Sequence, residues 1–357
     1  MPRFFHPWLR VRATMKPPSF DRKGRSPQVD RTSGAMFCRF PPYVLATILI
    51  VVIGQECLSF EDSSSKVLGE PKLDSKRAFS YLKKICDLGS RTTGTPGMQR
   101  QQEMLETHFT QLGGKILWQT NEVRHPQTGA KVEVKNLVVQ WQPENAQRVL
   151  LCTHYDTRPF PVMDAVNPKG LFVGANDGGS GTALFMELGH ALQNLPLAVG
   201  VDLIFFDAEE LVYEEKRDPY FLGSTFFAEA YANEPTSPRY RNGILVDMIG
   251  DAELQIFYEE NSFKFAKPLL EEVWGIAKEL KLKEFKPKLM HAIRDDHLPL
   301  NMIARIPVID IIDFDFTRGV PKSKNFWHTT SDTPDKCSGE SLTKVGSVLV
   351  EWVKRQK

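Results

Sequence analysis

The sequence predicts an α/β fold, a three-layer sandwich in which a central mixed, mostly parallel sheet is flanked by helices. From about Leu73, short apolar runs rich in Val, Ile and Phe alternate with longer segments. In these longer segments, apolar residues recur at three- and four-residue spacing, which is typical of amphipathic helices. Strands separated by helices form βαβ units, and such units place helices on both faces of a largely parallel sheet.

Two amphipathic helices are predicted first, at Ser75–Leu88 and Met98–Leu112, with a turn-forming loop between them. The predicted strands that follow are Asn136–Gln140, Val149–Thr153, Val201–Phe206, Ile244–Met248 and Val308–Ile312. The remaining predicted helices are Thr182–Leu195, Leu222–Ala232, Phe265–Leu280, Asp296–Ala304 and Ser341–Lys354. The pattern contains no internal repeat and gives no sign of a second domain.

The N-terminal region has a different composition. Residues 1–35 are rich in Arg, Lys, Pro and Ser, and we interpret them as a disordered basic leader or as a start assigned too far upstream, with Met15 and Met36 as alternatives. Within residues 36–57 an apolar run is shorter than the roughly 20 residues of a membrane span. It suits a signal peptide or a membrane anchor. Residues 58–72 are interpreted as a linker and 73–357 as the folded domain. We therefore expect export, as a secreted, periplasmic or membrane-anchored protein.

Overall charge and cysteine spacing exclude several classes of protein. The 45 basic and 44 acidic side chains give a formal net charge of +1, so nothing global indicates a nucleic acid or an anionic membrane as partner. Membrane contact is expected only through the N-terminal segment, and the protein is expected to be a monomer. The five cysteines have no paired C-x-x-C spacing, which argues against a thiolate zinc knuckle and a dense disulfide framework. Cys152 lies inside a strand-like run and is interpreted as a small buried hydrophobic residue.

Five acid and histidine clusters each end an apolar run or precede a helix. They are His154-Tyr155-Asp156, Asp177, Glu209-Glu210, Asp247 and His328. Ligands of parallel α/β sheets bind beyond the carboxyl ends of the strands, so the fold can gather these clusters at one edge. Histidine and carboxylate without thiolate is the ligand set of a zinc site that stays open to substrate. The clusters therefore predict a zinc-dependent enzyme that acts on an amide.

The individual clusters suggest separate roles. Asp156 is placed to hydrogen-bond a ligand histidine at position 154 and fix its tautomer. Glu209 and Glu210 are adjacent and can divide two tasks. One carboxylate can bind the metal while its neighbour carries a proton. Asp247 interrupts an apolar strand, where an unpaired carboxylate is costly, so a metal or a hydrogen-bond network is expected. Purely structural roles remain as alternatives. Asp177 could cap a helix, and the two glutamates could be a solvated charge pair.

Taken together, these residues resemble peptidase family M28 of zinc aminopeptidases, from about Ser80 to Trp352. Within that family they resemble the glutaminyl-peptide cyclotransferases most closely. The narrower likeness rests on Ile293-Arg-Asp-Asp-His-Leu-Pro299, on Trp327 directly before His328, and on Phe205-Phe-Asp-Ala-Glu-Glu210.

The resemblance implies one zinc ion per chain, held by Asp177, Glu210 and His328. It also implies that Glu209 is the general acid/base, with Asp295 and Asp247 as hydrogen-bonding supports. The expected substrate-binding residues are Trp327, Tyr213, Asp296 and His297. The implied reaction converts N-terminal glutaminyl residues of peptides or proteins to pyroglutamate and releases ammonia.

Two other functions stay open from sequence. A secreted M28-type zinc aminopeptidase would use the same residues around two metals, with His154 binding the second and Asp177 bridging; Asp247 is a further candidate ligand there. A non-catalytic receptor-like or scaffolding domain on this fold is the third possibility, which the complete set of ligands disfavours.

Overall fold

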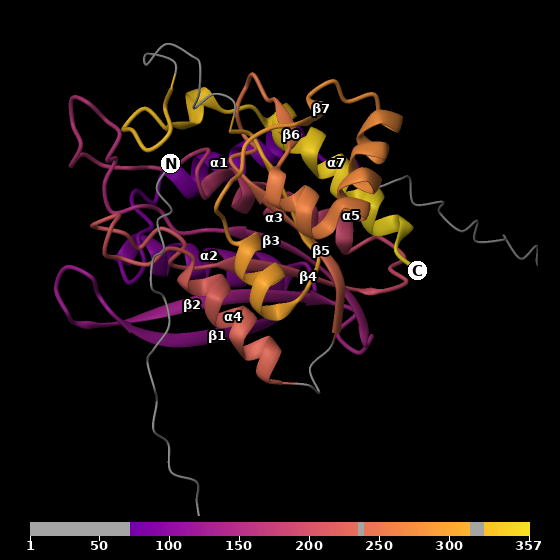
Figure 1. The fold of residues 1–357 in the computed structure, drawn as a ribbon, viewed down its shortest axis with the longest axis horizontal. Helices are drawn as coiled ribbons and strands as arrows, with labels where there is room; N and C mark the ends of the chain where they lie inside the picture. Colours follow the sequence, from indigo (N-terminus) through magenta and orange to yellow (C-terminus); the bar gives the residue numbers. More distant parts are fainter. Residues whose placement is uncertain (1–71, 235–238, 315–324) are drawn as a thin grey trace, which may run out of the picture. The chain divides into compact units, whose positions relative to one another are not determined.

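A six-stranded mixed sheet lies at the centre of the structure, with helices on both faces (Figure 1). This computed structural model describes residues 72–234, 239–314 and 325–357. The predicted leader, export segment and all but the last residue of the linker therefore lie outside the described residues. None of the helices in the described ranges is long and apolar enough to cross a membrane.

The sheet has the order β1-β2-β4-β3-β5-β8. Its strands are β1 (Lys115–Arg124), β2 (Lys131–Trp141), β3 (Gln147–His154), β4 (Gly200–Phe206), β5 (Arg239–Asp247) and β8 (Val308–Ile312). The β3–β4, β3–β5 and β5–β8 pairs are parallel, whereas β1–β2 and β2–β4 are antiparallel. The predicted mixed, mostly parallel sheet is therefore confirmed. A second, two-stranded sheet joins β6 (Ile256–Tyr258) and β7 (Phe285–Leu289).

The helices form the two outer layers. One face is covered by α1 (Ser75–Cys86), α2 (Pro96–Gln111), α3 (Gly179–Leu192), α5 (Glu260–Glu279) and α7 (Gly339–Arg355). The other face is covered by α4 (Leu222–Asn233), the short α6 (His297–Pro299) and a π-helical turn at Leu300–Ala304. The three-layer sandwich predicted from sequence is thus confirmed.

Strand β3 shows how the sequence produces both hydrophobic layers. Val149 and Leu151 pack toward the α1–α3–α7 side, whereas Leu150 and Cys152 pack toward α4. All four side chains are essentially inaccessible to solvent. A central parallel strand is buried on both faces, which explains its continuous apolar run. Burial of each large aliphatic side chain contributes about 1.5–3 kcal/mol. Cys152 has a free thiol, in agreement with its interpretation as a buried hydrophobic residue.

Several elements differ from the sequence prediction. The short strands β6 and β7 were not predicted, and two further differences have a clear physical reason. Strand β1 was not predicted, because as an edge strand it is half-exposed along its length and lacks a continuous apolar run. The single helix predicted at Asp296–Ala304 is instead a short α-helix followed by a π-helical turn. In this segment Pro299 lacks an N–H donor, and the Asn301 side chain bonds the backbone of Val308 on β8.

Candidate active site

A cavity of about 400 Å³ lies beyond the carboxyl ends of the parallel strands. Its polar lining contains six of the predicted site residues, namely Asp177, Glu209, Glu210, Asp247, Asp295 and His328. Its aromatic lining consists of Tyr220, Phe221, Phe314 and Trp327. The fold therefore brings residues from separate segments of the chain to one edge of the sheet, as the strand-end pattern predicts.

The three residues expected to hold a metal lie together. Asp177, Glu210 and His328 each offer a ligand atom within 4.8 Å of the others. The His328 Nε2 atom is 2.9 Å from Glu210 Oε1 and 3.3 Å from Asp177 Oδ2. All three residues are buried, with at most 5% of their surface exposed.

The chemistry of this group fits a divalent cation. Within the part of the chain that the structure describes, Glu210 Oε2 is buried and accepts no hydrogen bond, and the buried Asp177 Oδ2 has only its 3.3 Å contact with His328. Two buried carboxylates with unpaired oxygens are costly unless a cation compensates them. Two carboxylates and one imidazole also leave a fourth position open to substrate.

A second histidine lies beside the first group. The His154 Nε2 atom is 3.1 Å from Asp247 Oδ1 and 3.3 Å from Asp177 Oδ1. Burial opposes a charge on this imidazole, but Asp247 and the other carboxylates outweigh burial and raise the pKa of His154 well above its usual value. His154, Asp177 and Asp247 also lie within 4.8 Å of one another, close enough to hold a second cation.

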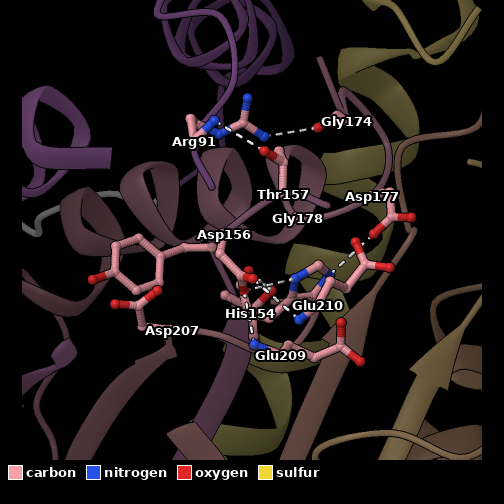
Figure 2. A network of polar contacts seen from close by, with 12 residues as sticks. Arg91, His154, Asp156, Thr157, Gly174, Asp177, Gly178, Asp207, Glu209 and Glu210 are labelled. Carbon is pink, nitrogen blue, oxygen red and sulfur yellow. Dashed lines mark hydrogen bonds and ion pairs between the residues drawn. The ribbon is translucent and has the colours of Figure 1, made fainter. Parts of the chain in front are cut away.

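Asp156 lies beside His154, as expected from sequence, and it has a second role in the loop that follows β4. Its Oδ1 atom is 3.5 Å from His154 Nδ1, and that nitrogen has no hydrogen-bond partner among the described residues. The Asp156 carboxylate accepts hydrogen bonds from the backbone N–H groups of Glu209 and Glu210, both at 3.1 Å (Figure 2). Asp156 therefore fixes the loop that carries the glutamate pair, and the same carboxylate faces His154.

The loop that carries Asp177 is held in the same way. The buried carboxylate of Asp332 accepts hydrogen bonds from the backbone N–H groups of Asn176, at 2.8 Å, and Asp177, at 3.1 Å. Burial and the neighbouring Asp177 raise the pKa of Asp332 to about 8. Arg91, which is fully buried, donates to the carbonyl of Gly174 at the start of this loop (Figure 2).

Strained backbone marks the edge of the site. Ala208, Met248, Phe221 and His328 all have positive φ, between 48° and 61°. Ala208 directly precedes Glu209, and Met248 directly follows Asp247. Residues other than glycine seldom adopt this conformation, which costs about 1–3 kcal/mol and clusters at functional sites.

Glu209 is suited to proton transfer. It lines the cavity and is 8% exposed, and burial together with Glu210 raises its pKa well above the usual value. Asp295 also lines the cavity, and burial, Asp247 and Asp296 raise its pKa. Within the described residues, however, neither Asp295 nor Asp247 is hydrogen-bonded to Glu209. Asp295 accepts from the backbone N–H of Asp296 at 2.6 Å, and Asp247 pairs with His154.

Trp327 lies where a pocket residue is expected. Its ring stacks on His328 with the centroids 4.0 Å apart, and it meets Phe314 edge-on. Tyr220 and Phe221 form another part of the wall. Sequence reasoning missed both, because the nearest aromatic residue after the glutamate pair is Tyr213.

Three predicted substrate-binding residues are not at this cavity. The Tyr213 hydroxyl instead contacts the His125 ring, with 3.1 Å between Oη and Nε2. Asp296 is fully buried and bonded to Ser224. His297 is also fully buried, 3.4 Å from a Glu259 carboxylate oxygen. These three residues therefore do not line the cavity that contains the predicted metal ligands.

Arg158 is a site residue that sequence reasoning missed. It is fully buried, and its Nη1 atom is 3.3 Å from Glu210 Oε1 and 3.1 Å from the Tyr220 hydroxyl. Its Nη2 atom is 3.6 Å from Glu215. Arg158 therefore lies behind three cavity-lining residues and positions them. The sequence feature that could have pointed to Arg158 is its position four residues after His154.

Comparisons with known proteins agree with this architecture. The model of "Peptidase family M28" matches residues 136–353. The Fimbriiglobus ruber glutaminyl cyclase structure is 38% identical, with a TM-score of 0.75 over 80% of this chain and 96% of that one. A leucine aminopeptidase precursor from Bacteroides thetaiotaomicron is 29% identical, with a TM-score of 0.73 over 82% and 100%. The glutaminyl-peptide cyclotransferase of Bothrops jararaca is 24% identical, over 73% of this chain and 76% of its own length.

The fold and the buried histidine–carboxylate site thus define the class of M28-type metal enzymes. This chain belongs to peptidase family M28 and, within it, to the glutaminyl-peptide cyclotransferases. The resemblance inferred from the sequence is confirmed.

Proposed function

We propose that this enzyme converts N-terminal glutaminyl residues of peptides and proteins to pyroglutamate, with release of ammonia, and that it uses one zinc ion per chain. The observation that supports this most is the meeting of Asp177, Glu210 and His328 beside Glu209 in one cavity. The 38% identity to a glutaminyl cyclase supports the choice of reaction.

Asp177, Glu210 and His328 would hold the zinc ion. When bound, zinc supplies Lewis-acid polarisation of the side-chain amide carbonyl of the substrate. Arg158 keeps Glu210 in place from behind, and Asp156 fixes the backbone of the glutamate pair. These contacts orient the ligands before substrate arrives.

Glu209 moves the proton. It accepts a proton from the substrate's α-amine, whose nitrogen forms a bond to the side-chain amide carbon. The bond from that carbon to the amide nitrogen then breaks, and Glu209 returns the proton so that ammonia leaves. Nucleophile and electrophile belong to one residue, so the cavity mainly folds the glutamine side chain into the geometry of attack. A volume of about 400 Å³ is suited to a small ligand of this kind.

An aminopeptidase activity is the second candidate, because His154, Asp177 and Asp247 form a second group that could hold a cation. The two activities differ in metal number and in nucleophile, since a two-metal peptidase activates water. In the one-metal enzyme, a protonated His154 bonded to Asp247 would take the place of the second cation.

Reconstitution tests the proposal. The metal is removed with a chelator, zinc is titrated back, and ammonia release from a Gln-initiated peptide is followed. We expect activity to reach its plateau at one equivalent of zinc per chain. A plateau at two equivalents, with removal of leucine from a Leu-initiated peptide, would assign the aminopeptidase instead.

The proposal also includes export through residues 36–57, a catalytic domain at 73–357 and a monomeric state.

A further inference from the structure

A second cavity, of about 460 Å³, lies outside the set of proposed catalytic residues. Its apolar lining comes from three segments: the turn after β1, the loop that follows Pro159, and the segment after Glu210. These contribute Pro126, Phe160, Val162, Pro168 and Tyr213, and the same segments add the polar side chains Gln127, Lys169, Glu214 and Arg217. Tyr213, which we expected in the catalytic pocket, belongs to this cavity.

The second cavity adjoins the active site at two places. Glu214 lines the second cavity and Glu215 lines the first. The Cα atoms of these consecutive residues are about 3.8 Å apart. Val162 lines the second cavity, and the N–H of the next residue donates to the carbonyl of His328, which lines the first, at 3.0 Å. An extended peptide advances about 3.3–3.6 Å per residue, so a chain leaving the active site reaches the second cavity within a few residues.

The segments that line this cavity are held in place by contacts with one another and with neighbouring residues. The Tyr213 hydroxyl is 3.1 Å from His125 Nε2, and the Tyr213 ring packs edge-on against Phe160 at 5.9 Å between centroids. The Asp164 carboxylate accepts from two N–H groups of its own loop and from the N–H of Thr330, which lies beyond His328. A site formed before binding avoids the entropy cost of ordering its loops.

The chemical character of the surface indicates the ligand. Val162 is 38% exposed, and on the same loop Met163, Val166 and Leu171 are 55%, 94% and 57% exposed. Exposed large apolar side chains that cluster in this way mark binding surfaces. Cyclisation changes only the first residue of a peptide. The residues that follow must therefore leave the catalytic cavity along its rim.

From these observations we propose that the second cavity binds an apolar side chain at position 3, 4 or 5 of the substrate, an inference that rests on the proposed function. The enzyme would then prefer peptides and proteins with an apolar residue shortly after the N-terminal glutamine, and Val162 would be a specificity-determining residue.

A peptide series tests this. The reference is the dipeptide Gln-Gly-amide, and the series is Gln-Gly-Gly-Gly-Gly-amide with leucine placed in turn at positions 3, 4 and 5. We expect one position to raise kcat/KM about five- to tenfold over glycine, through a lower KM. In Val162→Asp, the kcat/KM of that leucine peptide relative to the dipeptide should fall to near the value of the all-glycine peptide. Val166→Asp places the same charge on the same loop outside the cavity, and it should keep the wild-type ratio.

The outcomes separate this inference from the proposed function. A dipeptide that is cyclised without any leucine gain overturns the subsite and leaves the cyclase intact. If no peptide is cyclised, both fail. A leucine gain that survives in Val162→Asp would show that the side chain binds elsewhere. A dimeric wild type that Val162→Asp converts to monomers in sedimentation would assign the surface to contact between copies, and would likewise overturn the subsite.

Discussion

At the scale of single residues, the adjacent carboxylates Glu209 and Glu210 have different surroundings. Glu210 Oε1 lies 2.9 Å from His328 and 3.3 Å from Arg158, so its charge is compensated on two sides. Glu209 has no such partner among the described residues, and burial and its neighbour raise its pKa. This difference explains how one carboxylate can hold a metal while the next carries a proton.

Substitution of each glutamate tests this division. Glu209→Gln should retain zinc and the fold while lowering kcat about 100-fold or more, because it removes only the proton carrier. Glu210→Gln should lower the zinc content instead. Metal analysis and steady-state ammonia release on both variants are the measurements, and the reverse pattern would show that the roles are exchanged.

Asp295 offers a second test at this scale. It lines the cavity, and if it supports proton transfer, Asp295→Asn should lower kcat about tenfold or more with zinc content unchanged. Asp296→Asn is a matched control, because Asp296 is fully buried behind the cavity and bonded to Ser224. Near-normal cyclisation by Asp295→Asn would leave Asp295 only the structural role of binding the N–H of residue 296.

At the scale of structural elements, two buried carboxylates hold the loops that present the proposed metal ligands. Asp156, just after β3, binds two consecutive N–H groups of the loop that follows β4. Asp332 binds two consecutive N–H groups of the loop before α3. The proposed ligands are thus placed by loop-to-loop contacts in addition to the ends of their own strands.

Substitution of Asp156 tests this positioning. Asp156→Asn keeps one acceptor oxygen and turns an NH2 group toward a backbone N–H, so it should lower the free energy of unfolding of the metal-free protein by about 1.5–3 kcal/mol. It should also weaken zinc binding about 10- to 100-fold. Asp218→Asn is the control, since Asp218 accepts from the N–H groups of Tyr213 and Glu214 in the same manner but holds no proposed ligand. Unchanged zinc affinity in Asp156→Asn would contradict the account.

Side chains at strand ends could be predicted from the sequence, whereas contacts between loops could not. Residues such as His154 and Asp247 could be predicted because each ends a buried strand, and parallel strands bring their carboxyl ends to one edge. The roles of Asp156 and Asp332 could not be predicted, because each depends on a contact between loops that are 53 and 156 residues apart in the chain. Such contacts form only when the sheet has brought those loops together.

Other features were missed for related reasons. In the segment after Glu210, Tyr213 and Glu214 line the second cavity, whereas Glu215 and Tyr220 line the catalytic one, so the aromatic wall could not be located by spacing along the chain. Strand β1 was missed because a half-exposed edge strand carries little apolar signal.

At the scale of the whole molecule, the Asp295 loop is joined to the helix layer on the opposite face of the sheet through Glu259. This buried carboxylate caps α5 by accepting from the N–H groups of Asn261 and Ser262, and it also binds the N–H of Ile293. Burial opposes its charge, but hydrogen bonds from His297 and from the helix backbone outweigh burial and lower the pKa of Glu259 from 4.5 to about 2.

This shift predicts a pH dependence of stability. Because the pKa of Glu259 is lower in the folded state, its contribution is fully present above pH 4.5 and is lost as the pH falls toward 2. Glu259→Gln should therefore lower the free energy of unfolding at about pH 7 by about 2 kcal/mol, with a smaller difference from wild type at about pH 3. Denaturant unfolding at both pH values measures this. The exposed neighbour Glu260→Gln is the control, and an equal loss at both pH values would contradict the assignment.

The measurement that tests the central claim most directly is mass spectrometry of two peptides incubated with the purified zinc-loaded protein. One peptide begins with Gln and the other with Leu, and their remaining residues are the same. The account predicts that the first loses about 17 mass units, the mass of the ammonia that leaves on cyclisation, and that the second is unchanged. Removal of the N-terminal leucine from the second peptide, with no loss of ammonia from the first, would contradict it.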